Sequence, residues 1–260
     1  LEDNSGGSLL TIASTGVNTT FNGTDIGVRL DVTSDGIELD GSMFREYCNF
    51  EKTAATNSYG SGGNTFLDSL IIEHSGAGGY MLTGANNPDA FEDFISITSS
   101  GTGYCYFAYG ADGTYFQDEV EINDTCSSLG IRFGANAGAS TMTVGNTITI
   151  GSGGFSSGEL ELREFSQEGN AAISLTITST AFIDIYDSDF GGAFEASAAR
   201  IFTRGSNYAG VTSLTKTGAG SDASAGGNRF LANASITNDG SGYIIIGNGT
   251  PDTFDLDLDW

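Results

Sequence analysis

The sequence is poor in positive charge. Its 260 residues include nine Lys and Arg against 33 Asp and Glu, which gives a formal net charge of −24. Proteins that bind nucleic acid or anionic membrane surfaces need patches of Lys and Arg, so the composition argues against both classes of partner. It is compatible with divalent cations, with a saline medium and with the solubility of a long molecule. We expect most of the acids to lie on a solvated outer face.

Long apolar segments and cysteines are also scarce. No hydrophobic run approaches 18 residues, so we expect no membrane insertion. Of the three cysteines, Cys48 aligns with Leu70 at an inward-facing position. Cys105 falls in a predicted strand and Cys126 in the next turn, which permits a disulfide between them without implying one. The sequence starts without an initiator Met or a signal peptide and stops just inside a new repeat, so we expect a piece of a longer chain.

Two stretches of the sequence repeat one another at a distance of 164 positions, from 63 to 227. Residues 63–91 read GNTFLDSLIIEHSGAGGYMLTGANNPDAF, and residues 227–254 read GNRFLANASITNDGSGYIIIGNGTPDTF. Along the chain a bulky anchor residue recurs after small and polar residues. The anchors are Phe21, Phe44, Phe66, Phe91 and Phe116, less clearly Met142, Phe165 and Phe190, and then Phe230 and Phe254. The steps between clear neighbouring anchors are 22–25 residues, which suits one coil of a solenoid.

Within each repeat the apolar residues alternate with polar ones, which is the periodicity of a β-strand. The 39 glycines and the Ser- and Thr-rich runs argue against helices. The sequence therefore predicts an all-β protein, a right-handed parallel β-helix with about ten coils of 22–25 residues that forms one solenoid over residues 1–260. A β-sandwich, or a row of small sandwiches, is the structural alternative, but it would not explain a recurring unit of this length.

Two acidic clusters are candidate metal sites. Asp255, Asp257 and Asp259 alternate along one predicted strand and would share one face of it. The second cluster contains Asp184, Asp187 and Asp189. Calcium prefers oxygen ligands of this kind, but a single strand face spreads them apart, so plain surface charge is the alternative interpretation. Apart from calcium we expect no cofactor.

An enzyme is the main functional alternative, because many parallel β-helices cleave polysaccharides as lyases or hydrolases. Such sites need clustered carboxylates, or calcium with a basic residue. The best candidate places Arg200 and Arg204 opposite Asp184, Asp187 or Asp189 on an adjacent coil. No local cluster interrupts the repeat as a catalytic site should, so we predict no catalytic residues and no enzyme activity.

Repeat register also suggests where single residues lie. His74, the only histidine, aligns with Asn238 and so suggests a turn position. The tyrosines of the second apolar runs are expected in the core, although any that face outward could stack on sugar rings. They are Tyr80, Tyr104, Tyr106, Tyr109 and Tyr243.

A Thr-rich β-helix also invites the hypothesis of ice binding, which requires a flat outward column of one residue type. The predicted outward column is mixed and charged, and consists of Asp31, Asn49, Ile71, Ser96, Glu121, Thr149, Glu161, Asp184 and Asp257. Ice binding is therefore not expected.

The phrases GxGNTF, NDGSGYIIIGNGTPDTF and SSGTGYCYFAYGADGTYF resemble repeats of very large secreted surface proteins of the Bacteroidota, which include adhesin-like and gliding-associated proteins. The resemblance covers most of residues 60–135 and 225–258. It implies export and an extracellular or cell-surface location, and it brings no catalytic residues. The C-terminal sorting domain of such proteins has no counterpart in this sequence.

Together these observations predict a structural or adhesive element of an extracellular repeat protein, such as a stalk, filament or adhesin. Its expected partners are surface glycans or copies of itself, bound over a face rather than in a pocket. A polysaccharide-degrading enzyme and a self-assembling filament subunit stay as alternatives.

Overall fold

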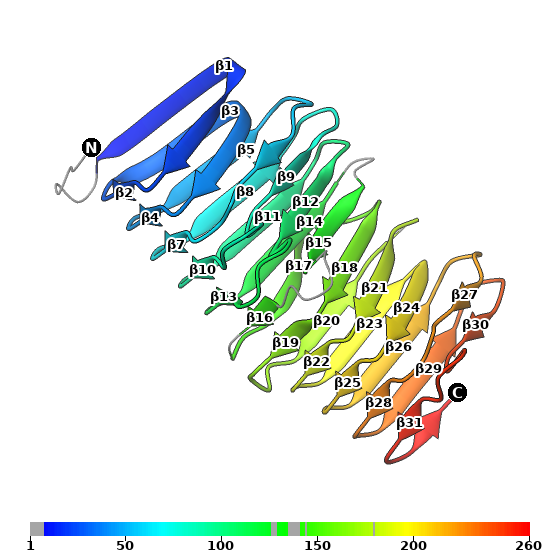
Figure 1. Ribbon diagram of the computed structural model, residues 1–260. Coiled ribbons are helices and arrows are strands. Elements are labelled where there is room, and N and C mark those ends of the chain that lie inside the picture. Colours follow the sequence, from blue (N-terminus) through cyan, green and yellow to red (C-terminus); the bar gives the residue numbers. More distant parts are fainter. Residues whose placement is uncertain (1–7, 126–128, 135–140, 144, 179) are drawn as a thin grey trace.

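The computed structural model describes residues 8–125, 129–134, 141–143 (backbone only), 145–178 and 180–260. Over these residues the chain forms 32 strands and no helix, so it contains no helix that could cross a membrane. The strands stack side by side into an elongated parallel solenoid of about eleven coils (Figure 1). The predicted all-β parallel β-helix is confirmed, while its right-handed sense stays a prediction.

Three parallel sheets run along the solenoid, and a typical coil contributes one strand to each. Sheet A is β1 (Leu9–Asn22), β3 (Arg29–Asp40), β5 (Cys48–Lys52), β8 (Leu70–His74), β11 (Ile95–Ser99), β14 (Val120–Asp124), β17 (Ile148–Phe155), β20 (Ile173–Thr176), β23 (Phe194–Ala198), β26 (Thr212–Lys216), β29 (Ala234–Asn238) and β32 (Leu258–Asp259). Sheet B is β2 (Asp25–Ile26), β4 (Met43–Phe44), β7 (Thr65–Phe66), β10 (Ala90–Phe91), β13 (Thr114–Phe116), β16 (Thr141–Thr143), β19 (Phe165–Gln167), β22 (Asp189–Phe190), β25 (Asn207–Tyr208), β28 (Arg229–Phe230) and β31 (Thr253–Phe254).

Sheet C is β6 (Ser58–Tyr59), β9 (Tyr80–Leu82), β12 (Tyr104–Phe107), β15 (Gly130–Phe133), β18 (Glu159–Arg163), β21 (Phe182–Tyr186) and β24 (Arg200–Arg204). A two-stranded sheet, β27 (Asp222–Ala223) and β30 (Ile244–Ile245), follows it near the C-terminal end. Sheet A continues without interruption from β1 to β32, so it links every coil of the solenoid.

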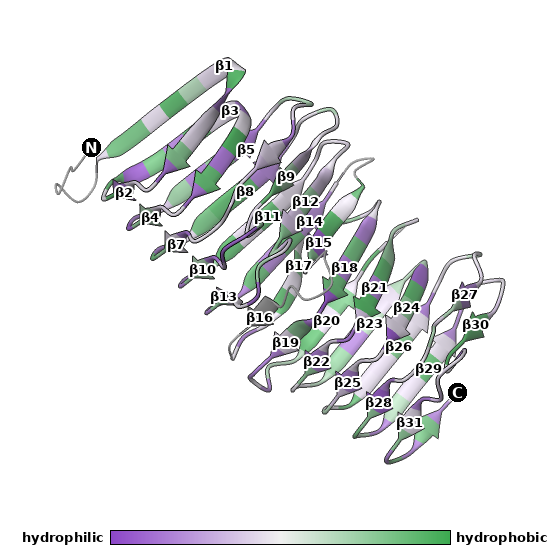
Figure 2. Cartoon of the chain, in the orientation of Figure 1, coloured by the Kyte–Doolittle hydropathy of each residue, from purple (hydrophilic) through white to green (hydrophobic). Residues whose placement is uncertain are grey.

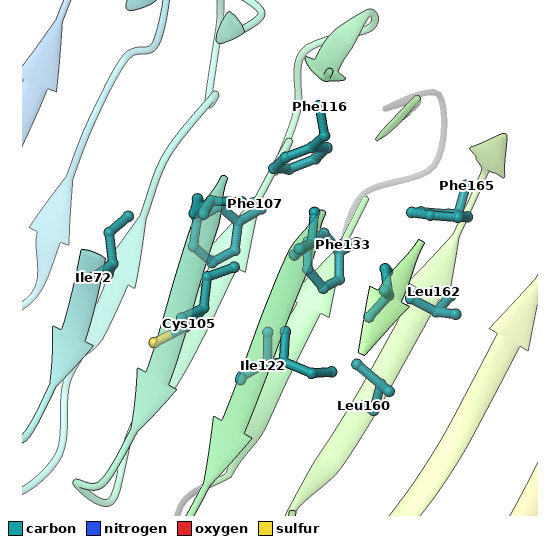
Figure 3. Close-up of a cluster of buried hydrophobic side chains, with 14 of the residues drawn as sticks. Ile72, Cys105, Phe107, Phe116, Ile122, Phe133, Leu160, Leu162 and Phe165 are labelled. Carbon is teal, nitrogen blue, oxygen red and sulfur yellow. The ribbon is translucent and has the colours of Figure 1, made fainter. Parts of the chain in front are cut away.

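The anchors of the sequence repeat form a column of stacked rings on sheet B. Neighbouring centroids are 4.8–5.2 Å apart, with interplanar angles of at most 5°, along Phe44, Phe66, Phe91 and Phe116. This spacing is that of neighbouring strands, so each ring packs on the equivalent ring of the next coil. Along the strands, apolar and polar residues alternate (Figure 2). The apolar ones converge from all three sheets on one core, part of which Figure 3 shows.

The coils vary more in length than the sequence suggested. Stacked residues of sheet B are 18 positions apart from Ile26 to Phe44, and 27 apart from Phe116 to Thr143. Phe21 belongs to β1 and pairs with Leu39 of sheet A, so its assignment to the anchor column was wrong. Near the C-terminal end the column continues with three stacked rings, which are Tyr208, Phe230 and Phe254. Of these, Tyr208 was not predicted as an anchor from the sequence. The side chain of Met142 lies outside the described residues.

The Asn and Asp of the two best-conserved sequence copies form a buried ladder at the corner before sheet B. Asn64 Oδ1 accepts a hydrogen bond from the backbone N–H of Ser42 on the preceding coil at 3.0 Å, and Asp89 Oδ1 accepts one from the backbone N–H of Asn64 at 2.9 Å. The second copy repeats these bonds with Ser206, Asn228 and Asp252. Burial raises the pKa of Asp89 to about 6. The expectation that acids lie outside is therefore wrong for Asp89.

Both lysines of the chain are buried at equivalent places, 164 positions apart, at the ends of β5 and β26. Lys216 Nζ donates to the carbonyls of Gly218 at 2.5 Å and Ser241 at 2.9 Å, and Lys52 Nζ donates to the carbonyl of Ala54. Each ammonium group therefore fixes the turn that follows its strand.

The structure corrects the predicted position of His74 and confirms that of Cys48. His74 ends β8, is fully buried and has its Nε2 3.2 Å from Lys52 Nζ, so it does not lie in a turn. Burial and then the adjacent ammonium group lower its pKa to about 4. Cys48 pairs with Leu70 in sheet A and is buried, as predicted. Cys105 is buried with a free thiol, and Cys126 lies outside the described residues.

Candidate functional site

The outer face of sheet C differs from the rest of the surface because it carries large aromatic and arginine side chains. Tyr104 and Tyr106 point outward, since Cys105 and Phe107 occupy the buried positions of β12. The prediction that these tyrosines lie in the core was wrong for both. Tyr80 and Tyr109 are also only half-buried, and Tyr243 is 55% exposed. We use "sheet C face" for the outward-facing side chains of β9, β12, β15, β18, β21 and β24.

A network of ion pairs crosses the middle of the sheet C face. Arg132 forms an ion pair with Glu159 and donates a hydrogen bond to the Tyr104 hydroxyl at 3.0 Å. Its Nε lies 3.2 Å from Glu161, and Arg163 Nε donates to the same carboxylate at 2.7 Å. Glu161 is only 2% exposed, so the guanidinium groups cover the acids beneath them.

Asp184 extends this network onto the next coil. It pairs in register with Glu161, is 8% exposed and accepts a hydrogen bond from the Tyr186 hydroxyl at 3.1 Å. Its second oxygen, Oδ1, is buried, and Glu159 is a neighbour of this carboxyl group. Burial, followed by the neighbouring Glu159, raises the pKa of Asp184 to about 8. This environment favours the protonated form of the carboxyl group.

The stability of the fold should consequently depend on pH through Asp184. The pKa of Asp184 in the folded state lies above its unfolded value. Its contribution to the free energy of unfolding is therefore fully present below about pH 4 and is lost as the pH rises through about 8. We expect Asp184→Asn to remove this loss. From pH 5 to pH 9, the unfolding free energy of the variant should rise relative to wild type by at least about 1.4 kcal/mol, the equivalent of one pKa unit.

Urea unfolding of both proteins at each pH measures this difference. The matched control is Asp189→Asn, which changes an exposed carboxylate. A pH-independent difference between Asp184→Asn and wild type would contradict the proposed protonation of Asp184.

The arginines of the predicted enzyme site lie on the adjacent coil, as expected, and Arg204 contacts one of the predicted acids, whereas Arg200 contacts a different one. Arg204 Nη2 is 3.6 Å from Asp187, whereas Arg200 Nε donates to Asp222 at 3.1 Å. Asp189 belongs to β22 of sheet B and accepts a hydrogen bond from Asn207 at 2.6 Å. Asp184, Asp187 and Asp189 therefore have separate partners, on different parts of one coil.

The cluster of Asp255, Asp257 and Asp259 is divided in the same way. Asp255 follows β31 and forms an ion pair with Arg229 at 2.9 Å, whereas Asp259 belongs to β32 and pairs with Ser235. Asp257 lies between the two strands, so the interpretation of one shared strand face was wrong. Among the described residues, no group of three or more His, Cys, Asp or Glu side chains is arranged to hold a metal ion. Calcium binding by either cluster stays a prediction.

The outward column used to argue against ice binding mixed two sheets. Glu161 and Asp184 belong to sheet C, and the residues that continue the sheet A column after Thr149 are Ser174, Glu195, Ser213 and Ser235. The corrected column still contains the charged Glu195, so ice binding is still not expected.

No protein-family model, curated protein or solved structure matches this chain. The fold by itself defines the class, a β-solenoid repeat protein. Five residues of the sheet C face were not predicted as site residues from the sequence. They are Arg132, Glu159, Arg163, Tyr186 and Phe202. The available signal was the alternation in ELELR and FIDIY, where charged or aromatic residues occupy every second position.

Proposed function

We propose that this chain is a structural and adhesive element of an extracellular surface protein, a stiff rod that carries a glycan-binding face. The observation that supports the structural part is the uninterrupted ladder of sheet A. Each coil buries its apolar side chains only against neighbouring coils, so the rod is continuous over a length of about 50 Å at about 4.8 Å per strand. The net charge of −24 favours solubility and separation between rods.

The adhesive part is assigned to the sheet C face. Protein surfaces that bind sugars commonly combine aromatic rings, which pack on the apolar face of a pyranose, with charged hydrogen-bonding groups at fixed positions. The ring centroids of Tyr104 and Tyr106 lie 5.2 Å apart beside Arg132, and Phe202 lies farther along the same face. Ion pairs and stacking hold these side chains in place, which reduces the entropy lost on binding.

Solution scattering, electron microscopy and a glycan array together test this proposal. We expect a monomeric rod that binds glycans on the array, and Tyr106→Ala to weaken that binding while leaving the rod intact. The matched control is Tyr59→Ala, which removes an exposed tyrosine from β6, the edge strand of sheet C that lies outside the sheet C face. A compact particle, or an array without any bound glycan, would contradict the proposal. Long assemblies in the micrographs would favour the filament alternative.

Polysaccharide cleavage is the second candidate, because the raised pKa of Asp184 favours a protonated carboxyl group beside Glu159 and Glu161. A carboxylic acid of raised pKa beside a second carboxylate is the arrangement of acid and base in glycosidases. Assaying the bound glycans for new reducing ends distinguishes cleavage from binding. Products that disappear in Asp184→Asn would favour the enzyme, and unchanged glycans would favour the adhesive role.

A further inference from the structure

Two arginines on the sheet C face lie on either side of one tyrosine. Arg163, Tyr186 and Arg204 occupy equivalent register positions on β18, β21 and β24, which are three successive strands. The guanidinium carbons of Arg163 and Arg204 lie 4.9 and 4.8 Å from the Tyr186 ring centroid. Cation–π contacts of this kind orient both guanidinium groups before any ligand arrives.

Among the described residues, most donors of the two guanidinium groups have no hydrogen-bond partner. In the part of the chain that the structure describes, the one side-chain hydrogen bond of Arg163 runs from Nε to Glu161. Arg204 forms no side-chain hydrogen bond there, and its ion-pair partner is Asp187, at 3.6 Å. The side chains of Arg163 and Arg204 are 26% and 46% exposed. A planar guanidinium with free N–H groups binds carboxylates and sulfates in a bidentate manner.

The charge distribution concentrates positive groups at this place. Four of the seven arginines belong to the sheet C face, and both lysines are buried. The acids of the same face, Glu161 and Asp184, are almost completely covered. Asp187, which pairs with Arg204, is an exposed acid at this place, but over the strands of the sheet C face an anion that approaches from solvent meets the guanidinium groups first, although the rod as a whole is acidic.

The register sets the distance between the two arginines. Two strand spacings separate β18 from β24, which corresponds to about 10 Å along the rod. A pyranose ring is about as long as one strand spacing, so acid groups on every second sugar of a chain parallel to the rod would repeat at this distance. An acid on every sugar would instead place one anion over Tyr186, between the arginines.

We propose that Arg163 and Arg204 bind a linear acidic polysaccharide that carries one carboxylate or sulfate group per disaccharide and lies parallel to the rod axis. This inference rests on the glycan-binding part of the proposed function and adds the class of glycan. Tyr186 is a positioning residue, because it holds both guanidinium groups and does not itself contact the anion.

Calorimetric titration of the full chain with defined oligosaccharides tests this inference. The probes are a hyaluronate decasaccharide, an oligogalacturonate of equal length with an acid on every sugar, and a neutral cello-oligosaccharide. We expect the hyaluronate to bind most tightly, with an affinity that falls as salt is added. Arg163→Gln and Arg204→Gln should each weaken binding about tenfold, the effect of losing a hydrogen bond to a charged group.

The matched control is Arg45→Gln, which removes an exposed arginine paired with Asp25 on sheet B. Circular dichroism spectra and melting temperatures establish that each variant folds. Equal binding of hyaluronate and oligogalacturonate, or equal losses in Arg45→Gln and Arg204→Gln, would overturn the inference. Tight binding of the neutral cello-oligosaccharide, with an affinity that is unchanged in Arg163→Gln and Arg204→Gln, would also overturn the inference but would leave the glycan-binding function in place. If none of the three probes and no glycan on the array bound the protein, both the inference and the proposed glycan-binding function would be overturned.

Discussion

Replacing Phe91 with Ala should lower the free energy of unfolding by about 3–5 kcal/mol, the cost of truncating a buried aromatic side chain. Phe91 is 2% exposed and packs parallel to Phe66 at 5.2 Å and to Phe116 at 4.8 Å. Truncation therefore interrupts the ring column on both sides and leaves a cavity. A solenoid is stabilised by contacts between neighbouring coils. The loss should therefore weaken the contacts of the coil that contains β10 with the coils that contain β7 and β13.

Guanidinium-induced unfolding followed by circular dichroism measures this loss. The matched control is Phe202→Ala, which removes a half-buried ring from the sheet C face and should cost less than half as much. Losses of equal size in the two variants would show that the column on sheet B contributes no more than an outer-face ring.

Replacing Lys216 with Met should destabilise the protein by at least about 3 kcal/mol, because each buried polar group left without its partner costs about 1–3 kcal/mol. Lys216 Nζ donates to the Gly218 and Ser241 carbonyls and lies 3.3 Å from Asn238 Oδ1. Methionine fills a similar volume but donates no hydrogen bond, so the variant isolates the role of the ammonium group. The turns after β26 and β29 should open first.

Urea unfolding and amide hydrogen exchange measure the size and location of this effect. Arg229→Met is the matched control, since it removes an exposed cation paired with Asp255 and should cost about 0–1 kcal/mol. The interpretation of Lys216 as a turn-fixing group fails if both variants lose the same stability, or if exchange around 217–243 stays unchanged.

The architecture was predictable because the two clearest copies of the repeat indicate both the length of a coil and the anchor residue that faces the core. Gly62 and Gly63, at the start of the first repeat copy, have φ of 86° and 78°, a backbone conformation that glycine adopts readily. Phe66 and Phe91 stack on each other as the repeat required. The prediction failed at Tyr208, because the coil before it is only 18 residues long and the anchor carries a hydroxyl group.

The sheet C face was not predictable in the same way. In Tyr104-Cys105-Tyr106-Phe107 both alternating positions are apolar enough to be buried, so a period of two does not decide which pair faces the core. The ion pairs of Arg132 with Glu159 and Glu161 join residues 27 and 29 positions apart. That pairing depends on the register of β15 against β18, in a stretch where the repeat is faint and the coils are long.

Local chemistry also outweighed the pattern at the acidic clusters. Asp255 and Asp259 alternate with leucines, yet the chain turns between β31 and β32, so a rule for one straight strand does not apply. Asp89 is buried because its carboxylate replaces a backbone acceptor at the corner, which the charge of the residue alone does not suggest.

The burial of both lysines makes the chain an intrinsic reporter of its own opening. An amine-acylating reagent reaches Lys52 only when the coils near the N-terminal end separate, and Lys216 only when those near the C-terminal end do. Mass spectrometry of the two acylated peptides would then follow the fraying of each end separately, without any substitution in the chain.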